Sequence, residues 1–185
     1  MKVIATEIDD VKLVEPDVHG DERGWFCETY SESRYAEFGI KARFVQDNES
    51  MSSRGVVRGL HWQAPPYTQA KLVRVERGAV LDVAVDIRRG SPTFGRHVAV
   101  ELSAANRRQL FIPRGFAHGF VVLEDGTVFS YKCDAPYSPG HERGMRFDDP
   151  ELGIKWPDLG AAITLSPKDR LHPPLKEIEP WEEKE

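Results

Sequence analysis

Short runs of apolar, β-branched and aromatic residues recur through the middle of the chain, and within them apolar and polar positions alternate. In the run 80–87, every second residue from Leu81 to Ile87 is apolar, whereas Asp82 and Asp86 occupy alternate positions. A period of two residues is the spacing at which side chains share one face of a strand. We therefore expect strands at 71–75, 80–87, 97–102, 109–112, 119–123 and 127–133.

Turn residues separate these runs, and helical patterns are few. Many short strands at this spacing predict a mainly β sandwich or barrel. Ser31 could cap a short helix over 32–38, and 168–171 could form a single turn. Eight prolines in the C-terminal third exclude long helices and central strands there. We expect that third to wrap the barrel as loops and short helices.

Composition places the chain among globular proteins of one domain. It has 185 residues, of which 40% are hydrophobic and 30% charged, with a net charge of −5. We expect a single domain over 1–185, with a mobile tail from about residue 181. The net charge argues against a nucleic-acid partner. No stretch approaches the roughly 20 apolar residues of a membrane span, and the first residues lack a signal-peptide core, so we expect a cytoplasmic protein.

Two histidines lie in contexts that suggest chemistry. His61 follows a glycine in RGLHWQ, and His118 opens an apolar run in GFAHGF. Each could also be a structural histidine, and the pattern alone does not decide. A metal site would need three or four converging ligands, and neither histidine has H-x-H or H-x-x-x-H spacing or an obvious third partner. Cys27 and Cys133 are far apart and form no C-x-x-C pair, which argues against zinc and a disulfide framework.

Three further residues have both a structural and a chemical interpretation. Tyr131 shares a strand face with Phe129, where a tyrosine usually packs. Lys71 begins a strand and could simply be solvated. Asp169 lies in the turn LSPKD, where aspartate often caps.

An ordered series of short motifs distinguishes between these interpretations. The segments are 21–28 (DERGWFCE), 45–52 (VQDNESMS), 55–61 (GVVRGLH), 69–71 (QAK), 82–88 (DVAVDIR), 90–93 (GSPT), 112–120 (IPRGFAHGF), 131–133 (YKC), 149–150 (DP), 154–157 (IKWP) and 165–169 (LSPKD). In this order, over roughly residues 10–172, they resemble the dTDP-4-dehydrorhamnose 3,5-epimerase family of cupins.

The resemblance implies a cupin jelly-roll β-barrel with short peripheral helices that acts as a homodimer without metal or cofactor. It also implies the substrate, a dTDP-linked 4-keto-6-deoxyglucose. The activity would be inversion at C3 and C5, giving dTDP-4-dehydro-L-rhamnose for dTDP-L-rhamnose biosynthesis.

Four residues match the family's chemical groups. His61 matches the base, and its ordinary pKa of about 6.5 suits that role. Asp169 matches the aspartate that orients it. Lys71 matches the cation at the C4 oxygen, where negative charge develops on the enolate. Tyr131 matches the acid that returns a proton on the opposite sugar face.

The resemblance also implies residues that bind the substrate. Arg23 and Arg58 match positions near the diphosphate, where guanidinium forms bidentate bonds. Strict alternation puts Arg58 and His61 on opposite strand faces, so we expect a bulge or strand end near Gly59. In the family, some binding residues come from the partner subunit. The other implied binding residues are Phe26, Glu28, Gln46, Asn48, His118, Tyr137, Glu142 and Lys168.

Other functions remain open at this point. A relative could invert only C3 or only C5 of a related sugar. The barrel could also be a non-catalytic module that binds sugar nucleotides, or a metal-dependent cupin enzyme. The presence of all four chemical residues favours the double epimerase.

Overall fold

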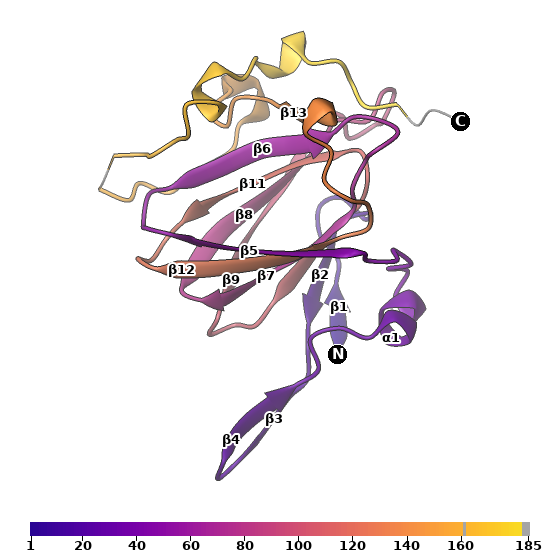
Figure 1. The fold of residues 1–185 in the computed structure, drawn as a ribbon, viewed down its shortest axis with the longest axis vertical. Coiled ribbons are helices and arrows are strands. Elements are labelled where there is room, and N and C mark those ends of the chain that lie inside the picture. Colours follow the sequence, from indigo (N-terminus) through magenta and orange to yellow (C-terminus); the bar gives the residue numbers. More distant parts are fainter. Residues whose placement is uncertain (161, 183–185) are drawn as a thin grey trace.

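The chain forms two antiparallel sheets that face each other (Figure 1), in a computed structural model that describes residues 1–160 and 162–182. The first sheet has the strand order β1 (Lys2–Ile4), β2 (Lys12–Glu15), β10 (Gln109–Ile112), β7 (Lys71–Arg77), β12 (Thr127–Cys133) and β5 (Gln46–Ser52). The second has the order β13 (Glu142–Gly144), β6 (Val57–Gln63), β11 (Phe116–Val122), β8 (Ala79–Asp86) and β9 (His97–Ser103). The expected mainly β jelly roll is confirmed.

All six expected strands are present; 109–112 and 127–133 have the expected bounds, and the other four have shifted ends. The strand expected at 119–123 begins three residues earlier at Phe116, and the one at 71–75 continues to Arg77. The expected helix appears as α1 (Glu32–Glu37), although the side chain of Ser31 makes no capping hydrogen bond. The turn expected at 168–171 is a 3-10 helix, η3 (Asp169–Leu171).

The main core lies between the two sheets. Val73, Leu110 and Phe129 from the first sheet pack against Ala84 and Phe120 from the second. Removing such side chains from water supplies most of the favourable free energy of folding. Alternation along the strands therefore delivers one face of each sheet to a shared interior.

The outer faces are covered by different parts of the chain. Tyr35 of α1 packs on the outside of the first sheet, against Val14 and Leu72. The C-terminal segment, residues 134–160 and 162–182, crosses the outside of the second sheet, where Leu175 packs with Val83. Its 3-10 helices are η1 (Pro139–His141), η2 (Pro150–Leu152), η3 and η4 (Leu175–Glu177). Both faces of β8 are consequently buried, although its sequence alternates.

A two-stranded hairpin projects away from both sheets. It consists of β3 (Val18–Asp21) and β4 (Gly24–Cys27), and we call it the arm (Figure 1). Two of its aromatic side chains are largely exposed, Trp25 to 61% and Phe26 to 69%. The guanidinium of Arg107 lies 3.5 Å from the centre of the Trp25 ring. This cation–π contact within the chain holds the arm in its orientation.

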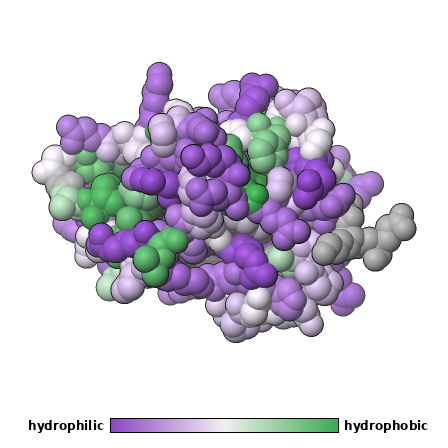
Figure 2. Space-filling model, turned by 90° about the horizontal axis from the view of Figure 1, so that it is seen from above, coloured by the Kyte–Doolittle hydropathy of each residue, from purple (hydrophilic) through white to green (hydrophobic). Residues whose placement is uncertain are grey.

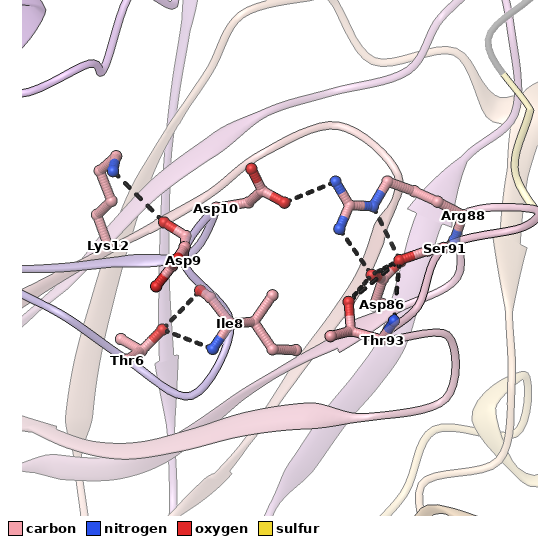
Figure 3. Close-up of polar contacts among 9 residues, drawn as sticks. All are labelled: Thr6, Ile8, Asp9, Asp10, Lys12, Asp86, Arg88, Ser91 and Thr93. Atoms are coloured by element: carbon pink, nitrogen blue, oxygen red, sulfur yellow. Dashed lines mark hydrogen bonds and ion pairs between the residues drawn. The ribbon is translucent and has the colours of Figure 1, made fainter.

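A buried carboxylate ties the end of β8 to its surroundings (Figure 3). Asp86 is fully buried and accepts hydrogen bonds from Arg88, Ser91 and Thr93. Arg88 also donates to Asp10, at 2.8 Å, and so links the network to the N-terminal segment. Burial alone would raise the pKa of Asp86, but these hydrogen bonds outweigh it and lower that pKa.

Trp181 is held where a tail was expected to begin. Its backbone N–H donates to Ile87, at 2.7 Å, and its carbonyl accepts from Arg89, at 2.8 Å. The remainder of that expected tail, residues 183–185, lies outside the described residues. No helix in the described part of the chain is long and apolar enough to cross a membrane.

Candidate active site

A cavity of about 480 Å³ opens between the sheets where β6, β7, β11 and β12 meet the C-terminal segment. A second cavity of about 310 Å³ adjoins it, and the two share His61, Lys71, Tyr131 and Glu142. Viewed from the side of the C-terminal segment, the surface is largely hydrophilic, with hydrophobic side chains gathered in separate patches (Figure 2). Most residues that line the two cavities are polar or charged, and Val57, Phe120 and Phe129 supply apolar wall in the larger one.

His61 and Asp169 form a hydrogen-bonded pair within the larger cavity. Nε2 of His61 on β6 lies 2.5 Å from Oδ1 of Asp169 on η3, although the residues are 108 positions apart. Burial alone would raise the pKa of Asp169, but the hydrogen bond with His61 and its charge lower it. Because Nε2 is engaged, Nδ1 is the nitrogen left to accept a proton, and it takes part in none of the hydrogen bonds among described residues.

The expected irregularity near Gly59 explains how Arg58 and His61 both reach the cavity. The pairing of β6 with β11 shifts register between His118 and Phe120, opposite this point. Gly59 has φ of 122°, and a Cβ there would lie 2.5 Å from Gly119 Cα. Only glycine tolerates both conditions, so it re-aims the strand.

Lys71 and Tyr131 lie on adjacent strands of the opposite wall. The Lys71 ammonium is 5.9 Å from the centre of the Tyr131 ring. Burial lowers the pKa of Lys71, although Cys133, Asp82 and Glu142 act in the other direction. Burial raises the pKa of Tyr131, which keeps its hydroxyl protonated as an acid must be.

His118 forms a second histidine–carboxylate pair deeper in the cavity. Its Nε2 lies 2.9 Å from Oδ2 of Asp82 on β8, and both side chains are almost fully buried. Burial lowers the pKa of His118, while the charge of Asp82 opposes that effect. Asp82 was not among the residues predicted for the site; an aspartate within an apolar strand was the available signal.

Several implied binding residues meet around the smaller cavity. Tyr137 donates through its hydroxyl to Glu142, at 2.6 Å, and through its backbone N–H to Gln46, at 2.9 Å. Gln46 in turn donates to Asn48, at 2.9 Å, and the ammonium of Lys168 lies 2.5 Å from Glu142. These five residues form one connected rim, and Tyr137, 53% exposed, presents a ring to solvent.

The three implied binding residues near the arm lie elsewhere. Among the described residues that line the two cavities, none comes from the arm or its base. Arg23 at the arm's tip is paired with Asp21, and Phe26 faces solvent. Glu28 forms an ion pair with Arg34, at 2.8 Å. Within one chain, these residues are therefore not brought to the site.

The structure supplies a third potential metal ligand that sequence spacing did not reveal. His172 joins His61 and Asp169 in a group whose ligand atoms all lie within 4.8 Å of one another. A tetrahedral ion about 2.0 Å from each ligand would hold those atoms about 3.3 Å apart. The 2.5 Å separation of His61 and Asp169 is too short for that arrangement and suits a shared proton.

Comparisons with known proteins agree with this geometry. The sequence model of the family described as dTDP-4-dehydrorhamnose 3,5-epimerase matches residues 5–177. A protein of that name from Methanothermobacter thermautotrophicus is 50% identical over 95% of each chain.

Two solved structures are also similar. The dTDP-6-deoxy-D-glucose-3,5-epimerase of Legionella pneumophila, in complex with dTDP-4-keto-L-rhamnose, has a TM-score of 0.94 and 50% identity over 99% of each chain. A 3'-monoepimerase from Streptomyces bikiniensis, in complex with dTDP-quinovose, has a TM-score of 0.86 and 37% identity, covering 93% of this chain and 87% of its own. The cavity residues, the family match and these relatives together show that this chain belongs to the dTDP-4-dehydrorhamnose 3,5-epimerase family.

Proposed function

We propose that this protein is a cofactor-independent isomerase that inverts C3 and C5 of dTDP-4-dehydro-6-deoxy-D-glucose. The product is dTDP-4-dehydro-L-rhamnose, a precursor of dTDP-L-rhamnose. The observation that carries the proposal is the His61–Asp169 pair, which lines the same cavity as Lys71 and Tyr131. The family and its 3,5-epimerase relatives support the substrate and the double inversion.

The chemistry follows from the acidity that a ketone at C4 gives to its neighbouring carbons. Nδ1 of His61 removes the proton from C5 or C3, and the electron pair moves onto the C4 oxygen as an enolate. Asp169 stabilises the imidazolium that forms. The Lys71 ammonium stabilises the enolate oxygen in a site largely closed to water.

Inversion requires that the new proton arrive on the opposite face of the sugar. Tyr131 extends from the first sheet and His61 from the second, so the two face the cavity from opposite walls. The Tyr131 hydroxyl gives its proton to the carbon as the enolate collapses back to the ketone. The His61 imidazolium then releases its proton to solvent and the Tyr131 phenolate takes one up, which restores both groups. Repetition at the second carbon completes the isomerisation with no net gain or loss of atoms.

We further propose that the working form is a cytoplasmic homodimer. The arm carries Arg23 and Phe26 away from the cavities of its own chain, with the Phe26 ring exposed. An arm of this kind can complete the site of a second copy, where Arg23 would bind the diphosphate. The two unpaired cysteines are compatible with a reducing compartment.

The test is an NMR assay of the 4-keto sugar nucleotide in D₂O, coupled to a 4-reductase that traps the product. We expect deuterium at both C3 and C5 and a trapped L-rhamno product. His61→Ala should abolish exchange at both carbons while calorimetry still detects dTDP binding, and His97→Ala, outside both cavities, should behave as wild type. Deuterium at one carbon would indicate a single-carbon epimerase, and none would indicate a binding protein.

A further inference from the structure

A second imidazole shares the carboxylate of Asp169. Nε2 of His172 lies 3.3 Å from Oδ1 of Asp169, the same oxygen that lies 2.5 Å from Nε2 of His61. The two histidine rings meet edge to face, with centres 5.5 Å apart and planes at 76°. His172 therefore contacts both members of the pair proposed to remove the proton.

Among the described residues, Nε2 of His172 has no hydrogen-bond partner other than the nearby Asp169 carboxylate. Its Nε2 is buried, and in the described part of the chain it makes no hydrogen bond of good geometry. Asp169 supplies the one carboxylate oxygen within 4 Å of it there. A carboxylate only accepts hydrogen bonds, so the contact is favourable when Nε2 of His172 carries a proton.

His172 is neutral when it makes this contact. Burial lowers its pKa, the charges of His61 and Lys168 act in the same direction, and Asp169 opposes them. A neutral imidazole has a single N–H, and the neighbouring carboxylate favours the tautomer that places this proton on Nε2.

The ring of His172 is itself held in place. It lies against the backbone of Gly144, which pairs with His61 in the register of β13 and β6, and any Cβ at position 144 would overlap it. The next residue is also anchored, because Arg146 donates its backbone N–H to the carbonyl of Pro173, at 2.9 Å. The His172 ring is therefore packed firmly against β13, the strand that pairs with β6 and its His61.

We propose that His172 is a positioning residue: its Nε2–H, 3.3 Å from Oδ1 of Asp169 and outside good hydrogen-bond geometry, attracts that oxygen and keeps it aligned with Nε2 of His61. The carboxylate torsion of an aspartate is broad, so the hydrogen bonds with His61 and Ser166 still allow the carboxylate to rotate. A further donor close to Oδ1 restricts that rotation and keeps the His61 ring and tautomer fixed for proton removal. This inference rests on the proposed function, in which the pair performs the chemistry.

Three variants of His172 separate the polar contact with Asp169 from the packing of the ring. His172→Phe retains the ring and loses the nitrogen, His172→Gln places an amide N–H near the former Nε2, and His172→Asn is too short to do so. We expect Phe and Asn to lower kcat for deuterium exchange about tenfold with KM within twofold, and Gln to recover most of the loss. Thermal unfolding identifies any variant that fails to fold. If His172→Phe fails to fold, the comparison of His172→Gln with His172→Asn still tests the role of the N–H group.

A double-mutant cycle tests whether His172 acts through Asp169. In an Asp169→Asn background, which should already exchange slowly, His172→Phe should cause no further loss. A full additional loss, or wild-type kcat in the His172→Phe and His172→Asn single variants, would overturn the inference. If Asp169→Asn alone exchanged at the wild-type rate, the proposed base pair would fail instead, so the two failures are distinguishable.

Discussion

Several ionisable residues lie in the barrel interior, where burial disfavours their charged forms. Asp82 and His118 are buried within the barrel and Lys71 is half-buried, so an ion at these positions loses solvation that it has in water. Each lies near an opposite charge or a hydrogen-bond partner, and the pKa values of Lys71 and His118 are lowered by burial. Groups that resist ionisation in this way are typical of sites that move protons.

The lowered pKa of Lys71 predicts where activity is lost in alkali. In the proposed mechanism the Lys71 ammonium stabilises the enolate, so exchange should fall as pH rises through a pKa below the ordinary 10.5 of lysine. Burial shifts the pKa of Tyr131 in the opposite direction, above 10.0. The pH dependence of kcat/KM for deuterium exchange measures this limb.

Variants of Tyr131 and Lys71 test which residue causes the loss of exchange at high pH, the alkaline limb of the pH profile. Tyr131→Phe should still wash deuterium into the base side, with the alkaline limb unchanged, while inverting poorly. Lys71→Gln should lose most activity, and its residual exchange should lack the limb. If Lys71→Gln kept the same alkaline limb, another group would be responsible.

Sequence reasoning reached these residues unevenly. The period of two placed Tyr131 and Phe129 on one face, and both do face the interior. Nothing local to the turn LSPKD shows that Asp169 meets a histidine on a distant strand; only the family resemblance connected them. His172 was missed because its contact with Asp169 depends on the packing of its ring against Gly144, which no sequence pattern reveals.

Among the secondary-structure elements, β6 depends most on one residue. Gly59 lets the strand change the direction of its side chains between Arg58 and His61. Its backbone φ and its contact with Gly119 both exclude a side chain. This irregularity therefore brings Arg58 and His61, the proposed diphosphate-binding residue and the proposed base, into one cavity from a single strand.

Gly59→Ala should accordingly be costly. We expect a loss of about 2–4 kcal/mol in the free energy of unfolding, because the backbone is strained and the close contact with β11 must open. Urea denaturation measures the loss. Gly140→Ala is the matched control, since a Cβ there meets nothing within 4 Å and should change stability by less than about 0.5 kcal/mol. Equal stabilities would contradict the role given to Gly59.

The Asp86 network offers a second test at this scale. Asp86→Ala should destabilise the fold by about 3 kcal/mol at neutral pH, because Ser91, Thr93 and part of Arg88 lose a buried acceptor. Asp10→Ala, which removes an exposed partner of the same arginine, should cost about 1 kcal/mol or less.

The stability difference between wild type and Asp86→Ala should change with pH in one direction. The pKa of Asp86 is lowered in the folded state, so its stabilisation is present above the unfolded pKa of about 3.9 and is lost as pH falls through the folded value. The gap between wild type and Asp86→Ala should therefore narrow in acid. A gap that is constant with pH would show that the carboxylate charge is not the cause.

The elements that sequence patterns missed lack the alternation that patterns detect. β5 reads QDNESMS, with a polar inward face beside the cavities and an outward face exposed to solvent. The arm has no core face at all. β6 breaks its own period at Gly59. β7, β11 and β12 also carry cavity residues, but they were predicted because each has a clear run of apolar positions.

At the scale of the whole molecule, the position of the arm predicts that two copies share their sites. Neither Arg23→Ala nor His61→Ala homodimers should be active, because each lacks one part of every site. In dimers refolded from a 1:1 mixture, one site of each heterodimer receives both intact parts, so about a quarter of sites should recover. Each variant refolded alone is the control, and a mixture with no recovery would show that the arm acts within its own chain.

The placement of Asp169 on the C-terminal segment also has a consequence for synthesis. Every strand of the two sheets except β13 is complete by Cys133, so a nascent chain can close its barrel while His61 is still alone. The carboxylate that orients His61 reaches it only when the segment crossing the second sheet has emerged from the ribosome. A chain that ends before that point lacks both the Asp169 carboxylate and the side chains that cover the second sheet. Under the proposed mechanism, activity therefore depends on the last part of the chain to be synthesised.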